Sequence, residues 1–173
     1  MKKRITKLFA LAIVMFAFTA GSFAQVSATA TASATIVAPI TINKTVDMNF
    51  GNVAVGAVAG TVVLTPASVR STTGGTTLPA VTGTVSAASF TVGGEPNFTY
   101  SITLPAAATT ISSGANNMTV DTWTSNPTVV AGGTLSGAGT QTLLVGGTLN
   151  VNASQAAGSY TSAIPFTVTV NYN

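Results

Sequence analysis

The chain has 173 residues with no cysteine and no histidine, and only 5% of the residues are charged. Four of the six basic residues lie within the first seven positions, so residues 25–173 carry two basic against three acidic side chains, a net charge of −1. Nucleic-acid binding needs a clustered basic face, which two separate cations cannot form. The usual catalytic bases, thiol nucleophiles and close carboxylate sets are also missing, so we expect no enzyme, no metal site and no cofactor.

Residues 1–24 have the pattern of a secretory signal peptide. Basic residues precede an uninterrupted apolar run from Leu8 to Phe18, and Ser22 and Ala24 give a small-x-small cleavage pattern. A membrane-spanning helix needs about 20 apolar residues, more than this run supplies. We therefore predict that Gln25 begins a mature protein secreted to the periplasm, the cell surface or the medium, with no membrane span left after signal removal.

Residues 25–38 form an N-terminal extension, and apolar and hydroxyl side chains alternate strictly over residues 26–36. A two-residue period is typical of a β-strand with one apolar face. No hairpin partner stands next to this segment, so we expect it to pair with a distant strand or with another chain. Its apolar face consists of Val26, Ala28, Ala30, Ala32, Ala34 and Ile36.

The first part of the following domain, residues 39–173, predicts short strands separated by turns. Alternation at residues 40–42 and 46–50 indicates strands, as does the apolar run 61–64. Small residues at 56–60 predict a turn before that run, and the Ser, Thr and Gly composition of residues 71–79 predicts a loop.

The middle of the domain contains the clearest internal strand, residues 98–104. A Gly-Gly-Glu-Pro-Asn turn separates it from an apolar segment at 88–92, which predicts a hairpin. In the strand that follows, the inward face is either Met118, Val120 and Thr122 or Thr119, Asp121 and Trp123. We expect the first set inside, with Trp123 at the strand end, where its N–H can find a partner.

The last part of the domain predicts two further strands. Gly146 and Gly147 interrupt residues 141–151 and indicate a β-bulge. No segment after the signal has helical periodicity over two turns, so the domain is predicted to be an all-β, immunoglobulin-like β-sandwich of about seven to nine strands. The final strand is predicted to turn one set of side chains inward: Phe166, Val168, Val170 and Tyr172.

Six blocks together resemble the bacterial domain-of-unknown-function family 4402, a likeness that covers nearly all of residues 25–173 and implies a secreted β-domain without an assigned activity. The blocks are ATASATIVAPITI within residues 28–42, DMNFGNV (47–53), FTVGGEPNFTYSITLP (90–105), MTVDTW (118–123), GTQTLLVGGTLNVNASQAAGSYT (139–161) and FTVTVNYN (166–173).

A more distant resemblance links the extension and the segment AAGSYTSAIPFTVTV (156–170) to chaperone–usher fibre subunits and to spore coat protein U domains. It implies an incomplete sandwich that is completed by the extension of the next subunit. Val26–Ile36 would then be the donor strand, and Phe166–Tyr172 would border the acceptor site. It also implies a periplasmic chaperone and an outer-membrane usher as partners.

Two functions follow as expectations. The first is a non-catalytic structural surface subunit, pilin-like or coat-like, which assembles with copies of itself or with related subunits by β-strand addition. The second is a monomeric secreted adhesin or carbohydrate-binding sandwich whose extension packs in cis. The candidate aromatic set for a carbohydrate is Trp123 with Tyr100 or Tyr160.

Overall fold

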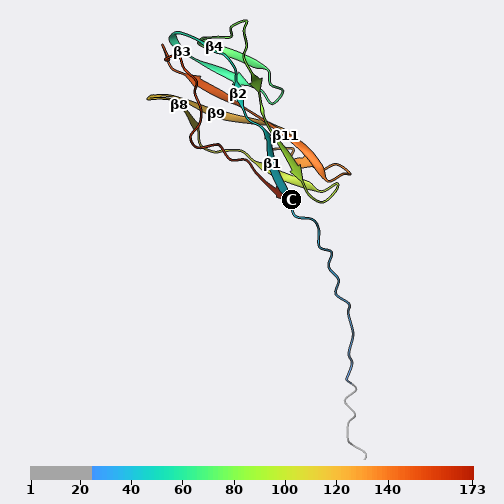
Figure 1. Ribbon diagram of the computed structural model, residues 1–173. Helices are drawn as coiled ribbons and strands as arrows, with labels where there is room; N and C mark the ends of the chain where they lie inside the picture. The colour runs from blue at the N-terminus through green and yellow to red at the C-terminus, as the bar shows by residue number, and fades with distance from the viewer. Residues whose placement is uncertain (1–24) are drawn as a thin grey trace, which may run out of the picture. The chain divides into compact units, whose positions relative to one another are not determined.

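The computed structural model describes residues 25–173, and all regular structure among them is β-strand (Figure 1). The predicted signal peptide lies outside these residues. The chain divides into two units, Met1–Thr35 and Ile36–Asn173, and the β-fold belongs to the second unit. The strands are antiparallel and form a β-sandwich, which confirms the predicted fold class, although twelve strands replace the expected seven to nine.

The larger sheet has seven strands and is built on β11 (Thr140–Val151), the longest strand. One edge of β11 pairs with β9, and the other pairs first with β6 and then with β3. Figure 1 shows β11 passing between β1 and the β3–β4 end of the domain. The other strands of this sheet are β1 (Thr41–Val46), β3 (Ala54–Leu64), β4 (Arg70–Thr77), β6 (Ala88–Gly93), β8 (Thr109–Ser113) and β9 (Asn116–Asn126).

The second sheet is much smaller and has β7 (Thr99–Thr103) at its centre. β7 pairs with the two-residue β10 (Gly133–Thr134) on one side and with β12 (Thr169–Tyr172) on the other. A separate two-stranded pair joins β2 (Asn49–Phe50) to β5 (Val85–Ser86).

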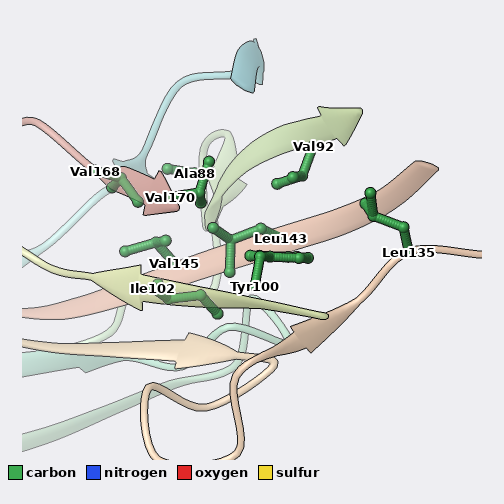
Figure 2. Close-up of a cluster of buried hydrophobic side chains, with 9 residues drawn as sticks. All are labelled: Ala88, Val92, Tyr100, Ile102, Leu135, Leu143, Val145, Val168 and Val170. Carbon is green, nitrogen blue, oxygen red and sulfur yellow. The ribbon is translucent and has the colours of Figure 1, made fainter. Parts of the chain in front are cut away.

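The main hydrophobic core lies between the two sheets, and Figure 2 shows its side chains pointing into that space. Leu143 and Val145 of β11 face Tyr100 and Ile102 of β7 there. Burying a side chain of this size stabilises the fold by about 1.5–3 kcal/mol. The cluster is completed by Ala88, Val92, Leu135, Val168 and Val170.

A second hydrophobic cluster lies at the other end of β11, beyond the reach of the smaller sheet. Its buried members are Val62, Val120, Leu149 and Val151. No strand of the β10–β7–β12 sheet contributes a side chain to this cluster. The side chains that pack against it are only partly buried: Met48, Phe50, Val53, Ile111, Met118 and Trp123.

Two predictions for the first half of the domain were wrong. Residues 71–79 are not a loop, because Arg70–Thr77 forms β4 and pairs with β3. Residues 56–60 are not a turn but an irregularity within β3, where the register shifts between Val55 and Gly60. Cross-strand pairing outweighs the loop-like composition here, since threonines suit a pleated surface and the Thr61 and Thr73 hydroxyl oxygens lie 2.7 Å apart.

The hairpin predicted around residues 93–97 was also wrong. β6 and β7 belong to different sheets, so the turn carries the chain across the core. Asn97 has a φ of 65° in this turn, a conformation that asparagine tolerates better than most residues. The alternation of the strand after the turn is confirmed, because Tyr100 and Ile102 are buried.

The irregularity predicted at Gly146 and Gly147 is confirmed, since the β11–β9 register shifts there. Two residues of β9, Thr122 and Trp123, oppose Gly147, and Thr122 has a φ of 48°. The bulge turns Thr122 outward and Trp123 inward, so the prediction that Thr122 lies inside was wrong. A side chain at Gly147 would contact the Trp123 ring, so glycine makes room for the indole.

Candidate functional site

The N-terminal extension forms no strand ladder within the described chain, and the side chains of residues 25–39 are exposed. Val26 is 93% exposed and Ile36 is 96% exposed. The alternating apolar face is therefore presented to solvent along its whole length. The prediction that it pairs with another strand remains a prediction.

The base of the extension is held by hydrogen bonds at the end of β12. The Ala38 backbone N–H donates to Oε2 of Glu95 at 3.0 Å, and the Tyr172 hydroxyl donates to the Ala38 carbonyl at 2.8 Å. The Glu95 N–H in turn donates to the Tyr172 hydroxyl at 2.6 Å. The Phe98 ring packs edge-on against Tyr172, with centroids 5.7 Å apart. These contacts fix Ala38 beside the C-terminal end of the last strand.

The predicted inward face of the last strand is found where expected. Val168 and Val170 are buried in the main core, and Phe166 and Tyr172 pack against it. The ladder itself begins only at Thr169. None of the backbone–backbone hydrogen bonds involves residues 162–168, and Thr161 is tied to the main sheet by a single bridge to Ser112. A seven-residue stretch of backbone next to β12 is therefore without a partner.

A groove of about 1140 Å³ opens beside this unpaired segment and has an apolar floor. Residues 47–55 form one wall of the groove, and residues 155–162 with Pro165 and Phe166 form the other. Strands β8, β9 and β11 supply its floor, which coincides with the second hydrophobic cluster. The floor side chains are Ile111, Met118, Val120, Trp123, Leu149 and Val151.

Aromatic side chains line part of this groove. The Trp123 and Phe166 rings contact each other with centroids 4.5 Å apart, and the indole N–H donates to the Ala107 carbonyl at 3.4 Å. The Tyr160 hydroxyl donates to the Ala156 carbonyl at 2.7 Å and accepts a hydrogen bond from Gln155. The structure thus brings Trp123 and Tyr160 to the same groove.

Tyr100, the other aromatic candidate for a carbohydrate site, is fully buried in the main core. Its hydroxyl donates to Oε1 of Gln141 at 2.8 Å, and burial raises the pKa of Tyr100 above its ordinary value. It is therefore a core residue and cannot stack on a ligand in the groove.

Charge is nearly absent from the groove. Lys44 and Asp47 form an exposed ion pair at its margin, with Nζ and Oδ1 2.6 Å apart. Arg70 lies behind one wall, where Nη1 donates to the carbonyls of Phe50 and Asn52 at 2.5 and 2.8 Å. Within residues 25–173, no three histidine, cysteine or carboxylate side chains are placed to hold a metal ion. The floor of the groove is apolar, whereas its walls also carry polar side chains such as Asn49 and Gln155.

Sequence reasoning found the extension and the inward face of the last strand but missed the groove. The floor residues come from three strands distant in sequence, so no local pattern unites them. The sequence contained one signal. Pro165 has no backbone N–H to donate to a neighbouring strand, so the last strand cannot be fully paired at this residue.

Comparison with known proteins gives one match. The family model described as "Domain of unknown function (DUF4402)" matches residues 40–172. No curated protein and no solved structure matches this chain significantly. Among residues 25–173, no helix has the length and hydropathy required to cross a membrane. The family model covers most of the chain and nearly all of the β-sandwich domain, and the chain therefore belongs to the DUF4402 family.

Proposed function

We propose that this protein is a secreted, non-catalytic structural subunit of a surface assembly, pilin-like or coat-like, which joins to further subunits by β-strand addition. The observation that carries the proposal is the extension: residues 25–36 alternate strictly, contain no charge, and expose their apolar face completely. A solvated monomer gains nothing from an apolar stripe of this kind, whereas a strand that joins a sheet buries it.

Energetically, the extension is built to bind mainly through its backbone. Four of its six apolar side chains are alanines, each of which gains about 0.8 kcal/mol on burial. Val26 and Ile36, at the two ends of the stripe, gain about 2 kcal/mol each. Main-chain hydrogen bonds to an unpaired strand edge, each worth about 1 kcal/mol, would supply much of the remainder.

The proposed partners are other copies of this chain or related surface subunits. A periplasmic chaperone and an outer-membrane usher belong to the same proposal, because an exposed, unpaired edge needs protection before assembly. Export rests on the signal pattern of residues 1–24. Mass spectrometry of the exported protein tests it, with Gln25 as the expected first residue.

Assembly is tested with the mature chain, residues 25–173, and a form that lacks residues 25–36. Size-exclusion chromatography and electron microscopy should reveal polymers of the mature chain that the deletion abolishes. A monomer in both cases, at concentrations up to the millimolar range, would refute the proposal.

A matched pair of substitutions separates strand addition from a mere requirement for length. Ala30→Asp places a charge on the apolar face of the extension, and Thr31→Asp places the same charge on the polar face. Ala30→Asp should abolish polymers and Thr31→Asp should retain them. Equal effects of the two substitutions would show that the alternation is irrelevant to assembly.

A carbohydrate-binding or adhesive module is the second candidate, and one observation favours it: Trp123 and Tyr160 line one groove together with the amide side chains of Asn49 and Gln155. Aromatic faces and amides are groups that recognise sugars. Binding to a glycan array that Trp123→Ala abolishes, by a protein that stays monomeric, would favour this function over assembly.

A further inference from the structure

We propose that β4 is a self-pairing edge of the larger sheet. In solution, β4 of one copy lies antiparallel beside β4 of a second copy, and Thr72 lies on the twofold axis between them. The two larger sheets then join into one continuous sheet. This contact is separate from strand addition by the N-terminal extension, and neither contact requires the other.

One edge of β4 is open. β4 is an outer strand of the larger sheet, and β3 is its only ladder partner among the described strands. The pairing with β3 is one residue for one residue from Arg70 to Gly74. Outside this ladder, no backbone–backbone hydrogen bond of the described chain involves residues 70–77. The side of β4 that faces away from β3 therefore has free backbone groups.

The turn before β4 shows which residues carry these free groups. The Thr65 N–H donates to the Val69 carbonyl at 2.9 Å, so the Val69 backbone faces β3. In an antiparallel ladder, every second residue turns both its N–H and its C=O to the same neighbour. Residues 69, 71 and 73 therefore face β3. The residues that face outward are Arg70, Thr72 and Gly74.

This edge lacks the protection that natural sheets usually give to an outer strand, which is charge, proline or a covering segment. The two other outer strands of the larger sheet have it, since β1 carries Lys44 and follows Pro39, and β8 is bridged to Thr161. The one charge of β4 is Arg70, and its guanidinium is bound to two carbonyls of the groove wall. The regular part of β4 is thus accessible to another strand.

A second copy of β4 matches this edge in the antiparallel direction. With Thr72 on the twofold axis, Thr72 opposes the partner's Thr72, and Arg70 opposes the partner's Gly74. All three outward residues of each copy then lie in hydrogen-bonded pairs, in which the two residues exchange both N–H···O bonds. An axis placed at Thr73 would pair only two of the three. The register centred on Thr72 therefore satisfies the outward backbone groups best.

The side chains also suit this register. Ser71 and Thr73 are exposed, and the Thr73 hydroxyl lies 2.7 Å from that of Thr61 on the neighbouring strand. In the dimer, Ser71 opposes the partner's Thr73, and hydroxyl pairs of this kind stabilise neighbouring strands. The β-branched Thr72 pair is likewise typical of paired strands.

Charge does not oppose the contact. Arg70 is the only ionisable residue of β4. In the proposed register the two Arg70 residues are four positions apart along the strands, a separation of about 14 Å. This exceeds the screening length of about 8 Å at physiological ionic strength. Two identical edges can therefore meet without appreciable repulsion.

The small size of the contact predicts weak binding. Five residues from each copy cover less than a standard interface, which buries about 1,200–2,000 Å². We therefore expect a dissociation constant of about 100 µM, as in weak, transient contacts between proteins.

Sedimentation equilibrium of the mature chain, residues 25–173, measures this association. All samples carry Ala30→Asp, which introduces a charge into the apolar face of the extension and should prevent strand addition. Thr72→Pro removes an outward N–H without removing a hydrogen bond to β3, whereas Thr72→Val retains the N–H and the β-branched shape.

The Ala30→Asp chain should dimerise between about 1 µM and about 1 mM. Thr72→Pro should raise the dissociation constant at least about tenfold, and Thr72→Val should leave it within about threefold. Circular dichroism should be the same for all three proteins. A monomer at the highest concentration, or equal dimerisation of the Thr72→Pro and Thr72→Val proteins, would overturn the inference.

A disulfide cross-link tests the register and does not depend on the proline variant, and it is possible because the natural chain has no cysteine. In the proposed dimer, the Cα atoms of Ser71 and the partner's Thr73 lie about 4.5 Å apart, within the range of about 4.4–6.8 Å that a disulfide spans. Mild oxidation of Ser71→Cys mixed with Thr73→Cys should therefore give a heterodimer in high yield. The control mixes Ser71→Cys with Thr142→Cys, an exposed site on the central strand β11. Equal yields would contradict the β4 contact.

The outcomes for this contact and for the proposed function are distinguishable. Polymers that require residues 25–36, together with no preference for the cross-link between positions 71 and 73, would refute the β4 contact and leave strand addition intact. The β4 cross-link in a mature chain that never polymerises would support the contact and refute the proposed function.

Discussion

Replacing Arg70 should loosen one wall of the groove at a measurable cost in stability. Its Nη1 donates to the carbonyls of Phe50 and Asn52, which flank Gly51 at a φ of 66°. One cation at the start of β4 thus holds the wall segment that contains β2. Arg70→Met retains most of the apolar stem of the side chain and removes both hydrogen bonds.

The expected loss follows from the exposure of the two bonds. Hydrogen bonds to charged groups contribute about 1.5–3 kcal/mol each when shielded from water. The bond to Phe50 is part-buried and the bond to Asn52 is exposed, so we assign about 1.5 kcal/mol to the first and about 0.5 kcal/mol to the second. Arg70→Met should therefore lower the free energy of unfolding by about 2 kcal/mol.

Equilibrium urea unfolding measures this loss. With a urea m-value of about 2 kcal/mol/M for a domain of this size, the midpoint should fall by about 1 M. Lys44→Met is the matched control, because Lys44 makes an exposed ion pair with Asp47 and should contribute less than about 0.5 kcal/mol. Equal, small effects of the two substitutions would refute the assignment of Arg70 as a structural anchor.

Three further substitutions test the fold. Gly133→Ala should cost about 1–3 kcal/mol in urea unfolding, because its Cβ would overlap the buried Tyr100 ring, whereas Gly137→Ala, with open space around it, should be neutral. Burial raises the pKa of Tyr100, so the folded state keeps its proton longer than the unfolded state; its contribution to stability is complete below about pH 10 and is lost as the pH rises further. In Tyr100→Phe the free energy of unfolding should fall less steeply between pH 9 and about pH 12. An unchanged pH dependence of the free energy of unfolding would contradict the burial argument. Thr122→Gly should raise the free energy of unfolding by about 1 kcal/mol, because it relieves a β-branched residue at positive φ, and a clear loss of stability would show that no strain is stored there.

The strands that the sequence predicted correctly are those with one buried face. Tyr100 and Ile102, like Val168 and Val170, alternate with polar residues because their strands lie between the core and solvent. The predictions failed at β3 and β4, where small and hydroxyl-bearing residues pair with one another. Composition alone does not distinguish such a hairpin from a loop, because its stability comes from cross-strand contacts.

Of the candidate site, only the N-terminal extension was predictable from the sequence. The extension is one continuous segment, so its period is visible in the sequence. The groove instead depends on side chains of β8, β9 and β11 that come together from distant parts of the sequence, so no local pattern reveals it. The bulge that turns Trp123 toward the groove likewise arises from pairing with Gly147 of a distant strand.

Under the proposed strand addition, the donor and the accepting edge are different surfaces of one molecule, and this determines the form of the assembly. With Val26–Ile36 as the proposed donor segment, each copy would give one strand and receive one. Copies joined by such a heterologous contact form a ring if the rotation between neighbours closes, and otherwise they form an open fibre. Low charge, which is a hazard in a soluble monomer, would then be compatible with function, because the proposed strand addition would cover the exposed apolar stripe. A twofold-symmetric dimer that exchanges both extensions would leave no free donor or acceptor, so fibres and closed dimers are distinguishable by mass alone.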